Sequence, residues 1–248
     1  MDLHYVPLFL GLVAFAACSH GFMGLGFGII ALAGMGLTSW NLERTAASLN
    51  IVIPLLLLSV IFAGRKDFKI DTKIAFTVIL GELGGVPLGY WCLATFGARP
   101  IFTLFLGIAL VAMVLDQVIR PRFDQPLSLP VGFLAGLIGG VLTGAFTSGG
   151  PVVALFLYSR YRHPADAKGT LQLIFMGAIL YRLVNIQFLG GGFTLDVLML
   201  SAVILPLVLV FPWLGHRLAR NASSRLFARV VFGFIGLIGT VHIVKYFA

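Results

Sequence analysis

The stretch Thr143–Pro151, TGAFTSGGP, interrupts an apolar run that extends from residue 129 to residue 157. The default prediction for such a run is a helix that crosses a membrane. Three glycines and a proline fall within eight residues here. They predict a break, because glycine weakens a helix and proline removes a backbone donor. In lipid, the backbone groups that a break leaves unpaired are tolerated only inside protein or against a wet cavity. We therefore expect a ligand site at Thr143–Pro151.

A second glycine-rich stretch, Ser19–Gly28 (SHGFMGLGFG), lies near the start of the chain. Residues 11–32 align with residues 134–155 at an offset of 123 residues, which places glycine on glycine at 21 and 144 and at 26 and 149. Further matches follow in the same order at offsets of 125 and 126 residues. Each match is weak in a glycine-rich chain, but their consistent order predicts an internal duplication.

Composition places the chain in a membrane. Hydrophobic residues make up 59% of its 248 residues and charged residues 10%, whereas soluble domains are about one quarter charged. The apolar runs are about twenty residues long and do not alternate, so the spans are expected to be helices rather than barrel strands. The net charge of +8 does not indicate nucleic acid, because most basic residues cluster in short loops between apolar runs, as in cytoplasmic loops.

The predicted fold class is an all-α polytopic membrane protein made of two repeats. Each repeat consists of one glycine-broken hairpin and three transmembrane spans. The hairpins are expected at 7–37 and 129–158, the spans at 45–63, 72–95, 100–118, 167–189, 195–215 and 227–247, and a cytoplasmic linker at 120–128. The first repeat then covers residues 1–119 and the second residues 129–248.

Charge predicts that the two repeats are inverted. The loop after the second apolar segment carries Arg65, Lys66, Lys69 and Lys73 in the first half and no basic residue in the second. In all three pairs of equivalent loops the positive excess switches sides, so equivalent loops face opposite sides of the membrane. Inversion requires an odd number of crossings per half. One of the four segments in each half must therefore enter and leave on the same face.

The hairpins are the segments that do not cross. At about 30 residues each, they are too short for two spans of roughly 20 residues, so each is predicted to be a re-entrant hairpin or a pair of broken helices. Thirteen basic residues then lie inside and three outside, namely Arg44, Arg99 and Lys245, and both termini are extracytoplasmic. The alternative, eight ordinary crossings, would place equivalent loops on the same side and scatter the charges.

The two hairpin tips, entering from opposite faces, are expected to meet near the middle of the bilayer. Helix N-termini there expose backbone N–H groups, each end equivalent to about half an elementary charge, and glycines let a ligand approach closely. Hydroxyl and imidazole donors add to this preference for a small oxyanion. The alternative is that the glycines serve close helix packing. The candidate binding residues at the tips are Ser19, His20, Gly24, Gly26, Gly28, Thr147, Ser148, Gly149 and Gly150.

Polar residues in the other apolar segments complete the candidate site. Asn50 and Gln172 occupy nearly equivalent positions on the spans after the hairpins, and we expect them to donate from the wall of the site. Arg182 either counters the anion or extends to the membrane surface. Ionisable groups in a membrane are costly and functional by default. Glu82 and Asp116 are therefore candidates for proton coupling, although a structural hydrogen bond explains Glu82 equally well. Neither a cofactor nor a metal ion is expected, since the two cysteines lack metal-ligand spacing.

Three further polar residues receive structural interpretations. Asp71 and Asp196 match across the repeat at the starts of spans, where helix capping explains them. His242 is interpreted as a packed or interfacial histidine.

The paired glycine-rich stretches, together with the chain length and charge pattern, resemble the sulfite exporter TauE/SafE family over essentially the whole chain. Ser148–Pro151 (SGGP) fits the family's pattern of glycines that end in a proline after an apolar lead-in. Gly24–Gly28 (GLGFG) departs from that pattern, because it lacks the tight glycine run and the proline. The resemblance implies an anion permease of the bacterial inner membrane. Its implied substrates are sulfite and organosulfonates such as sulfoacetate, with export the commoner direction.

Energetics favour export, since a negative charge that moves outward against an inside-negative potential gains about 2.3 kcal/mol per 100 mV. An exporter can therefore run as a uniporter, whereas an importer needs proton coupling. A passive anion channel would share this architecture. An intramembrane serine protease using Ser148 is disfavoured, because Phe146 replaces the expected glycine and no histidine is well placed. The expected partners are a small anionic substrate and the lipid bilayer, with homo-oligomerisation left open.

Overall fold

The computed structural model describes residues 3–64, 68–97, 99–119, 126–147, 149–161, 164–189, 192–221 and 224–247. These residues form helices and no strand. After a short 3₁₀ helix η1 (Leu3–Tyr5) the order is α1 (Val6–Met23), α2 (Phe27–Met35), α3 (Leu42–Gly64), α4 (Thr72–Phe96), α5 (Pro100–Ile119), α6 (Leu129–Phe146), α7 (Gly150–Arg160), α8 (Pro164–Leu189), α9 (Leu195–Asn221) and α10 (Ser224–Phe247). The predicted all-α fold class is confirmed.

Both glycine-rich stretches break a helix. The helix α1 ends at Met23 because Gly24 and Gly26 adopt left-handed conformations, with φ of 85° and 104°, which glycine reaches without a steric penalty. The helix α6 ends where Thr147 adopts φ 57°, and α7 restarts with a proline in its first turn, where the missing N–H costs nothing. Each hairpin therefore has an 18-residue arm and a shorter arm of nine or 11 residues.

Seven helices of the described residues are long and apolar enough to cross a membrane. They are α1, α3, α4, α6, α8, α9 and α10, and α5 adds a shorter apolar stretch, Pro100–Ala112. The list includes the long arm of each hairpin, whose 18 residues extend about 27 Å at 1.5 Å per residue. A hairpin tip therefore reaches deep into the bundle rather than staying near one surface.

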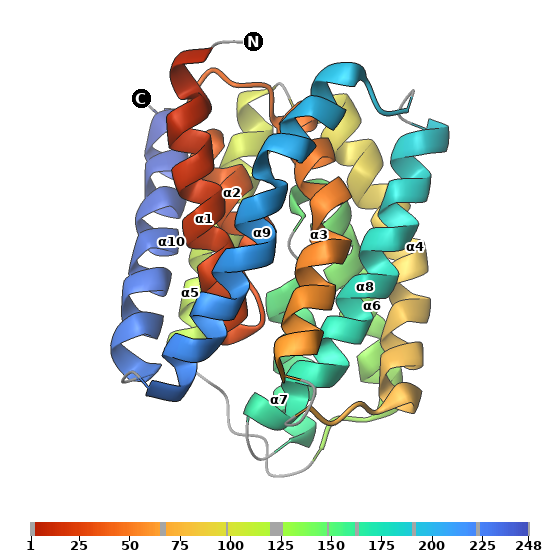
Figure 1. The fold of residues 1–248 in the computed structure, drawn as a ribbon. Helices are drawn as coiled ribbons and strands as arrows, with labels where there is room; N and C mark the ends of the chain where they lie inside the picture. Colours follow the sequence, from red (N-terminus) through yellow and green to blue (C-terminus); the bar gives the residue numbers. More distant parts are fainter. Residues whose placement is uncertain are drawn as a thin grey trace.

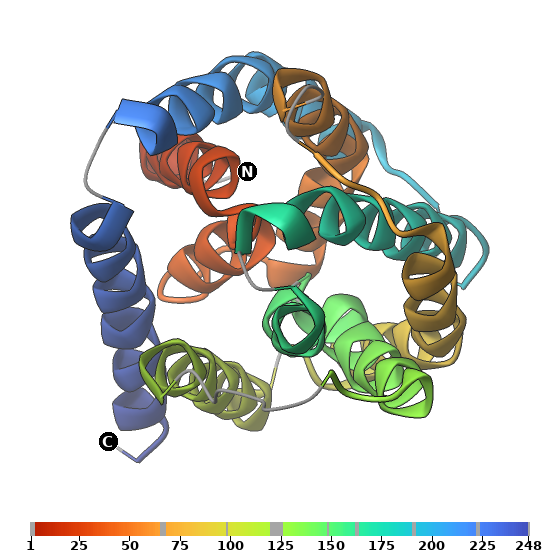
Figure 2. The ribbon, with the colours of Figure 1, turned by 90° about the horizontal axis from the view of Figure 1, so that it is seen from below.

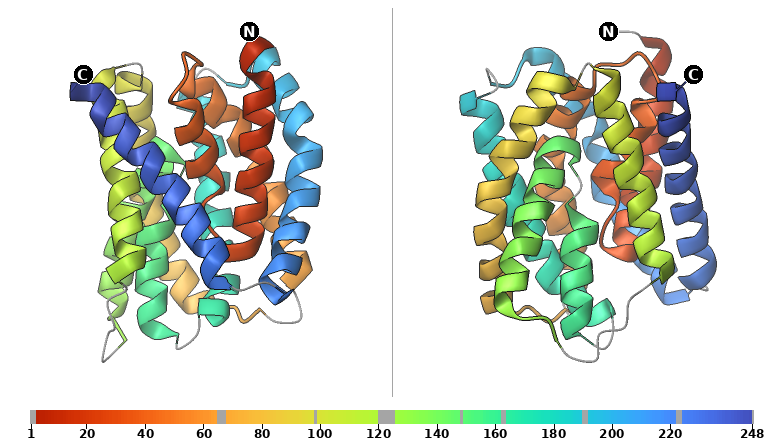
Figure 3. Two further views of the ribbon diagram at one scale, coloured as in Figure 1. Left: turned by 90° about the vertical axis from the view of Figure 1, so that its left-hand side faces the viewer. Right: turned by 180° about the vertical axis from the view of Figure 1, so that it is seen from behind.

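The two hairpins enter the bundle from opposite ends. The arms α1 and α2 enter from the end where both chain termini lie, whereas α6 and α7 enter from the other end (Figures 1 and 3). Seen along the bundle axis, the short arms α2 and α7 lie toward the middle, with the longer helices around them (Figure 2). All nine residues of α2 are buried.

Helix pairing is the same in both halves of the chain. The helix α1 packs on α9 of the other half, and its counterpart α6 packs on α4. The same exchange relates the α3–α9 pair to the α8–α4 pair, while α3 packs on α8 and α5 on α10, which crosses it at a slant (Figure 3). A two-fold relation between the halves would produce this pattern. The pairing pattern is the one expected of the predicted repeats.

Glycines allow the long arms to approach their partners at backbone distance. A Cβ at Gly144 of α6 would collide with the backbone of α4, and one at Gly89 with the backbone of α6. The equivalent contact between α1 and α9 is made by Gly21 and Gly215, again with no space for a Cβ. For Gly21 and Gly144, the packing alternative describes the structure.

The structure decides the interpretation of the three other polar residues. Asp71 caps α4 by accepting the N–H of Ile74 at 3.0 Å, as predicted. His242 is buried and bonds the carbonyl of Ala33 through Nε2 at 3.0 Å, so it is a packed histidine.

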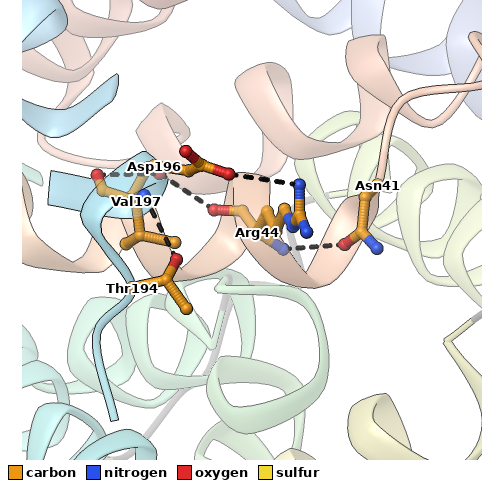
Figure 4. A network of polar contacts seen from close by, with 6 residues as sticks. Asn41, Arg44, Thr194, Asp196 and Val197 are labelled. Atoms are coloured by element: carbon orange, nitrogen blue, oxygen red, sulfur yellow. Dashed lines mark hydrogen bonds and ion pairs between the residues drawn. The ribbon is translucent and has the colours of Figure 1, made fainter. Parts of the chain in front are cut away.

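The capping prediction for Asp196 is wrong. The helix α9 begins at Leu195, so Thr194 occupies the cap position and its hydroxyl accepts the N–H of Val197 at 3.4 Å. Asp196 lies inside the first turn and forms an ion pair with Arg44 of α3 at 3.6 Å (Figure 4).

Candidate functional site

The two hairpin tips enclose one cavity of about 40 Å³. The first tip contributes His20 with residues 25–28, and the second contributes Thr143, Thr147, Gly149 and Gly150. The walls come from α3, through Ile53 and Leu57, and from α8, through Phe175, Ala178 and Ile179. Residues from both predicted stretches are therefore brought together in one site.

The cavity lies at half the height of two spanning helices. Ile53 is the middle residue of α3 (Leu42–Gly64), and the three wall residues from α8 lie within three positions of its centre. A buried water needs about 10–15 Å³, so the cavity holds a few waters or one small oxyanion head group. This depth agrees with the predicted position near the middle of the bilayer.

Helix N-termini supply the positive field of the cavity. The helix α2 starts at Phe27 and α7 at Gly150, both in the cavity lining, and the first N–H groups of a helix have no partner within it. The two tips touch, because a Cβ at Gly28 would collide with the carbonyl of Thr147. An anion in the cavity therefore lies against two helix N-termini at once.

His20 lines the cavity, and one of its ring nitrogens is hydrogen-bonded to Gln172, which lies outside the lining. Its Nε2 lies 3.0 Å from Oε1 of Gln172, and the amide nitrogen of Gln172 donates to the carbonyl of Gly24 at 2.9 Å. Because the amide nitrogen of Gln172 is used in this way, its Oε1 is the atom that faces His20. An amide oxygen accepts, so Nε2 of His20 is the donor. Its Nδ1 is buried and has no partner among the described residues. A neutral His20 therefore offers the cavity an acceptor rather than the donor predicted from the sequence.

The second tip presents a hydroxyl donor. The Oγ1 of Thr147 accepts from the Arg182 guanidinium at 2.6 Å, which leaves the hydroxyl proton free to donate to a ligand. The N–H of Gly149 is used by Oγ1 of Thr143 at 3.0 Å. Of the predicted backbone donors at this tip, Gly150 keeps its N–H available, because its first-turn position gives it no helical acceptor.

Several predicted residues lie outside the cavity lining. Ser19 donates to the carbonyl of Phe15 at 2.8 Å within its own helix. Asn50 donates to the carbonyl of Ala46. Gln172 contacts the first tip rather than the cavity, and Gly24 belongs to the turn that this amide holds.

Among the remaining candidates, the structure describes the side chains of Arg182 and Glu82 but not those of Ser148 and Asp116. Arg182 is fully buried, so the snorkelling alternative is wrong: its guanidinium bonds the second tip instead. Glu82 is also fully buried, and both of its carboxyl oxygens lack a partner in the described part of the chain. Ser148 and the side chain of Asp116 lie outside the described residues.

A vestibule adjoins Arg182 on the side of the chain termini. It has a volume of about 300 Å³, and its lining includes Glu43, Arg44, Tyr90 and Arg182. The lining of a neighbouring cavity of about 220 Å³ includes Trp40. The ring of Trp40 packs against Tyr5 near the N-terminus. Arg44 lines both spaces.

Sequence reasoning missed the wall residues and one cation. The sequence did hold a signal for the wall, because apolar pairs at i, i+4 spacing recur at nearly equivalent positions in the two halves and point to a shared face. The pairs are Ile53 with Leu57 on α3 and Phe175 with Ile179 on α8. Lys168 lies one turn before Gln172 and bonds the first tip, which its place at a loop end concealed.

The comparisons with known proteins decide the family. Residues 9–241 match the sequence profile described as "Sulfite exporter TauE/SafE". The chain belongs to this family. It is 27% identical over 245 residues to the "Probable sulfite/organosulfonate exporter TauE" of Cupriavidus necator, a match that covers 94% of this chain and 93% of the relative. No solved structure matches the chain.

Family membership confirms the resemblance seen in the sequence. Together with the seven apolar helices, it identifies a multi-pass membrane transporter of the anion-exporting type rather than an enzyme. The alternative of a serine protease is thereby excluded.

Proposed function

We propose that the protein exports sulfite or an organosulfonate such as sulfoacetate across the bacterial inner membrane, by alternating access around the tip cavity. The observation that carries this proposal is a single cavity, at half the height of α3 and α8, that both hairpin tips line. The name of the relative from Cupriavidus necator supports this substrate class.

The donors around the cavity suit a sulfonate or sulfite head group. The Thr147 hydroxyl and the N-termini of α2 and α7 supply hydrogen bonds and partial positive charge without a cation in the lining. A volume of about 40 Å³ admits only the head group, so the organic part of a larger sulfonate would extend from the cavity toward one mouth.

The fold supports alternating access by two inverted halves. The hairpins enter from opposite ends (Figure 3), and the helix pairings exchange between the halves, as in transporters built from inverted repeats. In this proposal the end with both termini is extracytoplasmic, because Arg44 and Lys245 lie there with few other cations, and the vestibule is the outer mouth.

The test is anion binding by the purified protein, measured by calorimetry with sulfoacetate. We expect Thr147→Val to weaken binding about tenfold, because it removes one hydrogen bond to a charged ligand. Thr147→Ser keeps the hydroxyl and is expected to bind like the unmodified protein.

The matched control is Thr103→Val in α5, whose hydroxyl bonds the carbonyl of Pro100 at an exposed position. Sulfoacetate binding that is unaffected by Thr147→Val would contradict the site. In proteoliposomes, saturable counterflow distinguishes the proposed carrier from a passive channel.

A further inference from the structure

Two cations of α8, one partly exposed and one fully buried, bond the carbonyl ends of the two long hairpin arms. The Lys168 ammonium donates to the carbonyls of Gly21 at 2.7 Å and Phe22 at 3.4 Å, in the last turn of α1. The Arg182 guanidinium donates to the carbonyl of Thr143 at 2.5 Å, in the last turn of α6. Neither cation lines the tip cavity.

These contacts matter because a hairpin tip brings opposite helix ends together. Each tip places the C-terminus of a long arm, equivalent to about −0.5 charge, beside the N-terminus of a short arm, equivalent to about +0.5. Left alone, the two partial charges would largely cancel at the cavity. A cation on the carbonyl end removes the negative partner and leaves the positive N-terminus to act on the ligand.

We propose that Lys168 and Arg182 set the charge selectivity of the tip cavity by neutralising the carbonyl ends of α1 and α6. The inference rests on the proposed function and deepens it: the site then discriminates among sulfur oxyanions by net negative charge. Among the described residues, Nε and one terminal nitrogen of Arg182 are buried donors without a partner, behind the second tip.

Both cations belong to the second half of the chain. At the offset of 123 residues, Lys168 corresponds to residue 45 (168 − 123) and Arg182 to residue 59 (182 − 123). Those positions hold Thr45, whose hydroxyl donates to the carbonyl of Asn41 just before α3, and Ser59, whose hydroxyl donates to the carbonyl of Leu56 within α3. The helix α8 therefore contacts both tips through cations 14 residues apart, or about 21 Å along its axis.

The experiment compares two sulfonates of different charge. Sulfoacetate carries a sulfonate and a carboxylate, whereas taurine carries a sulfonate and an ammonium and has no net charge. We expect Lys168→Gln and Arg182→Gln each to weaken sulfoacetate binding about tenfold and taurine binding by a clearly smaller factor. Lys168→Arg and Arg182→Lys keep the charge and are expected to restore the preference for sulfoacetate.

Lys245→Gln is the matched control, because Lys245 also donates to a backbone carbonyl, that of Leu37 in the turn after α2, at an exposed position. Equal losses for both sulfonates in the Gln variants, or equal losses in the charge-conserving variants, would show a purely structural role and overturn the inference. If Arg182→Gln does not fold, Lys168→Gln decides, since Lys168 is partly exposed. Failure of the unmodified protein to bind sulfite as well as both sulfonates would overturn the proposed function too.

Discussion

Glu82 is a fully buried carboxylic acid within the apolar helix α4. It lies at the contact between α4 and α6, where a Cβ at Gly140 would collide with the backbone of Glu82. Its carboxyl oxygens have no partner among the described residues. An unpaired charge at that depth is costly, which favours the neutral form of the carboxyl. It does not line the tip cavity.

We predict that Glu82→Gln retains export within about twofold of the unmodified rate, because a carboxamide matches a neutral carboxyl in size and polarity. The measurement is sulfoacetate flux in proteoliposomes, with and without a pH gradient. Loss of flux, or loss of a response to the gradient, would instead make Glu82 the proton carrier and would contradict uniport.

Some residues of the site could be predicted from their type and position in the sequence, and others could not. The glycines of the second tip and Thr147 were found because their types are unusual inside an apolar run. Lys168 was not found, because a lysine near a loop is indistinguishable from a solvated one until the fold shows the carbonyls of Gly21 and Phe22 beside it.

At the scale of helices, the contact between α4 and α6 is built on backbone approach. Cβ atoms at Gly81, Gly85 and Gly89 would each collide with a carbonyl of α6. This contact holds the long arm of the second hairpin, and hence the depth of its tip.

We predict that Gly85→Ala lowers the free energy of unfolding by about 1–3 kcal/mol, because the added methyl forces the two helices apart. Thermal unfolding in detergent measures the change. Gly233→Ala in α10, where no atom lies within 4 Å of the added Cβ, is the control and is expected to leave stability unchanged. An equal effect of the two substitutions would contradict the packing argument.

Helix boundaries were largely predictable, and helix ends inside the hairpins were predictable to within a few residues. Apolar length and glycine clusters determine both, as the break at Gly24–Gly26 illustrates. The packing of α1 on α9 and of α6 on α4 was not predicted. It depends on contacts between halves that are distant in sequence, and no single-helix pattern encodes them.

At the scale of the whole molecule, the charge pattern predicts which end faces the cytoplasm. Arg99 and Arg217 are both described, and the positive-inside argument places them on opposite sides. Each lies over an aromatic ring, Phe96 and Trp213 respectively.

We predict that a membrane-impermeant maleimide labels Arg99→Cys in intact cells and labels Arg217→Cys only after permeabilisation. Both substitutions are made in a background with Cys18→Ala and Cys92→Ala, so that no other thiol reacts. Labelling of both positions from the same side would contradict the orientation and, with it, the assignment of the vestibule as the outer mouth.

The placement of both tip-holding cations on α8 has a consequence for the ancestry of the chain. If the halves arose by duplication, the ancestral unit worked as an antiparallel homodimer. A pair of units like residues 129–248 would carry cations for both tips, in duplicate, whereas a pair like residues 1–119 would carry none at these positions. On that proposal the first half depends on the second for both cations, so the two halves would be complementary parts rather than interchangeable ones.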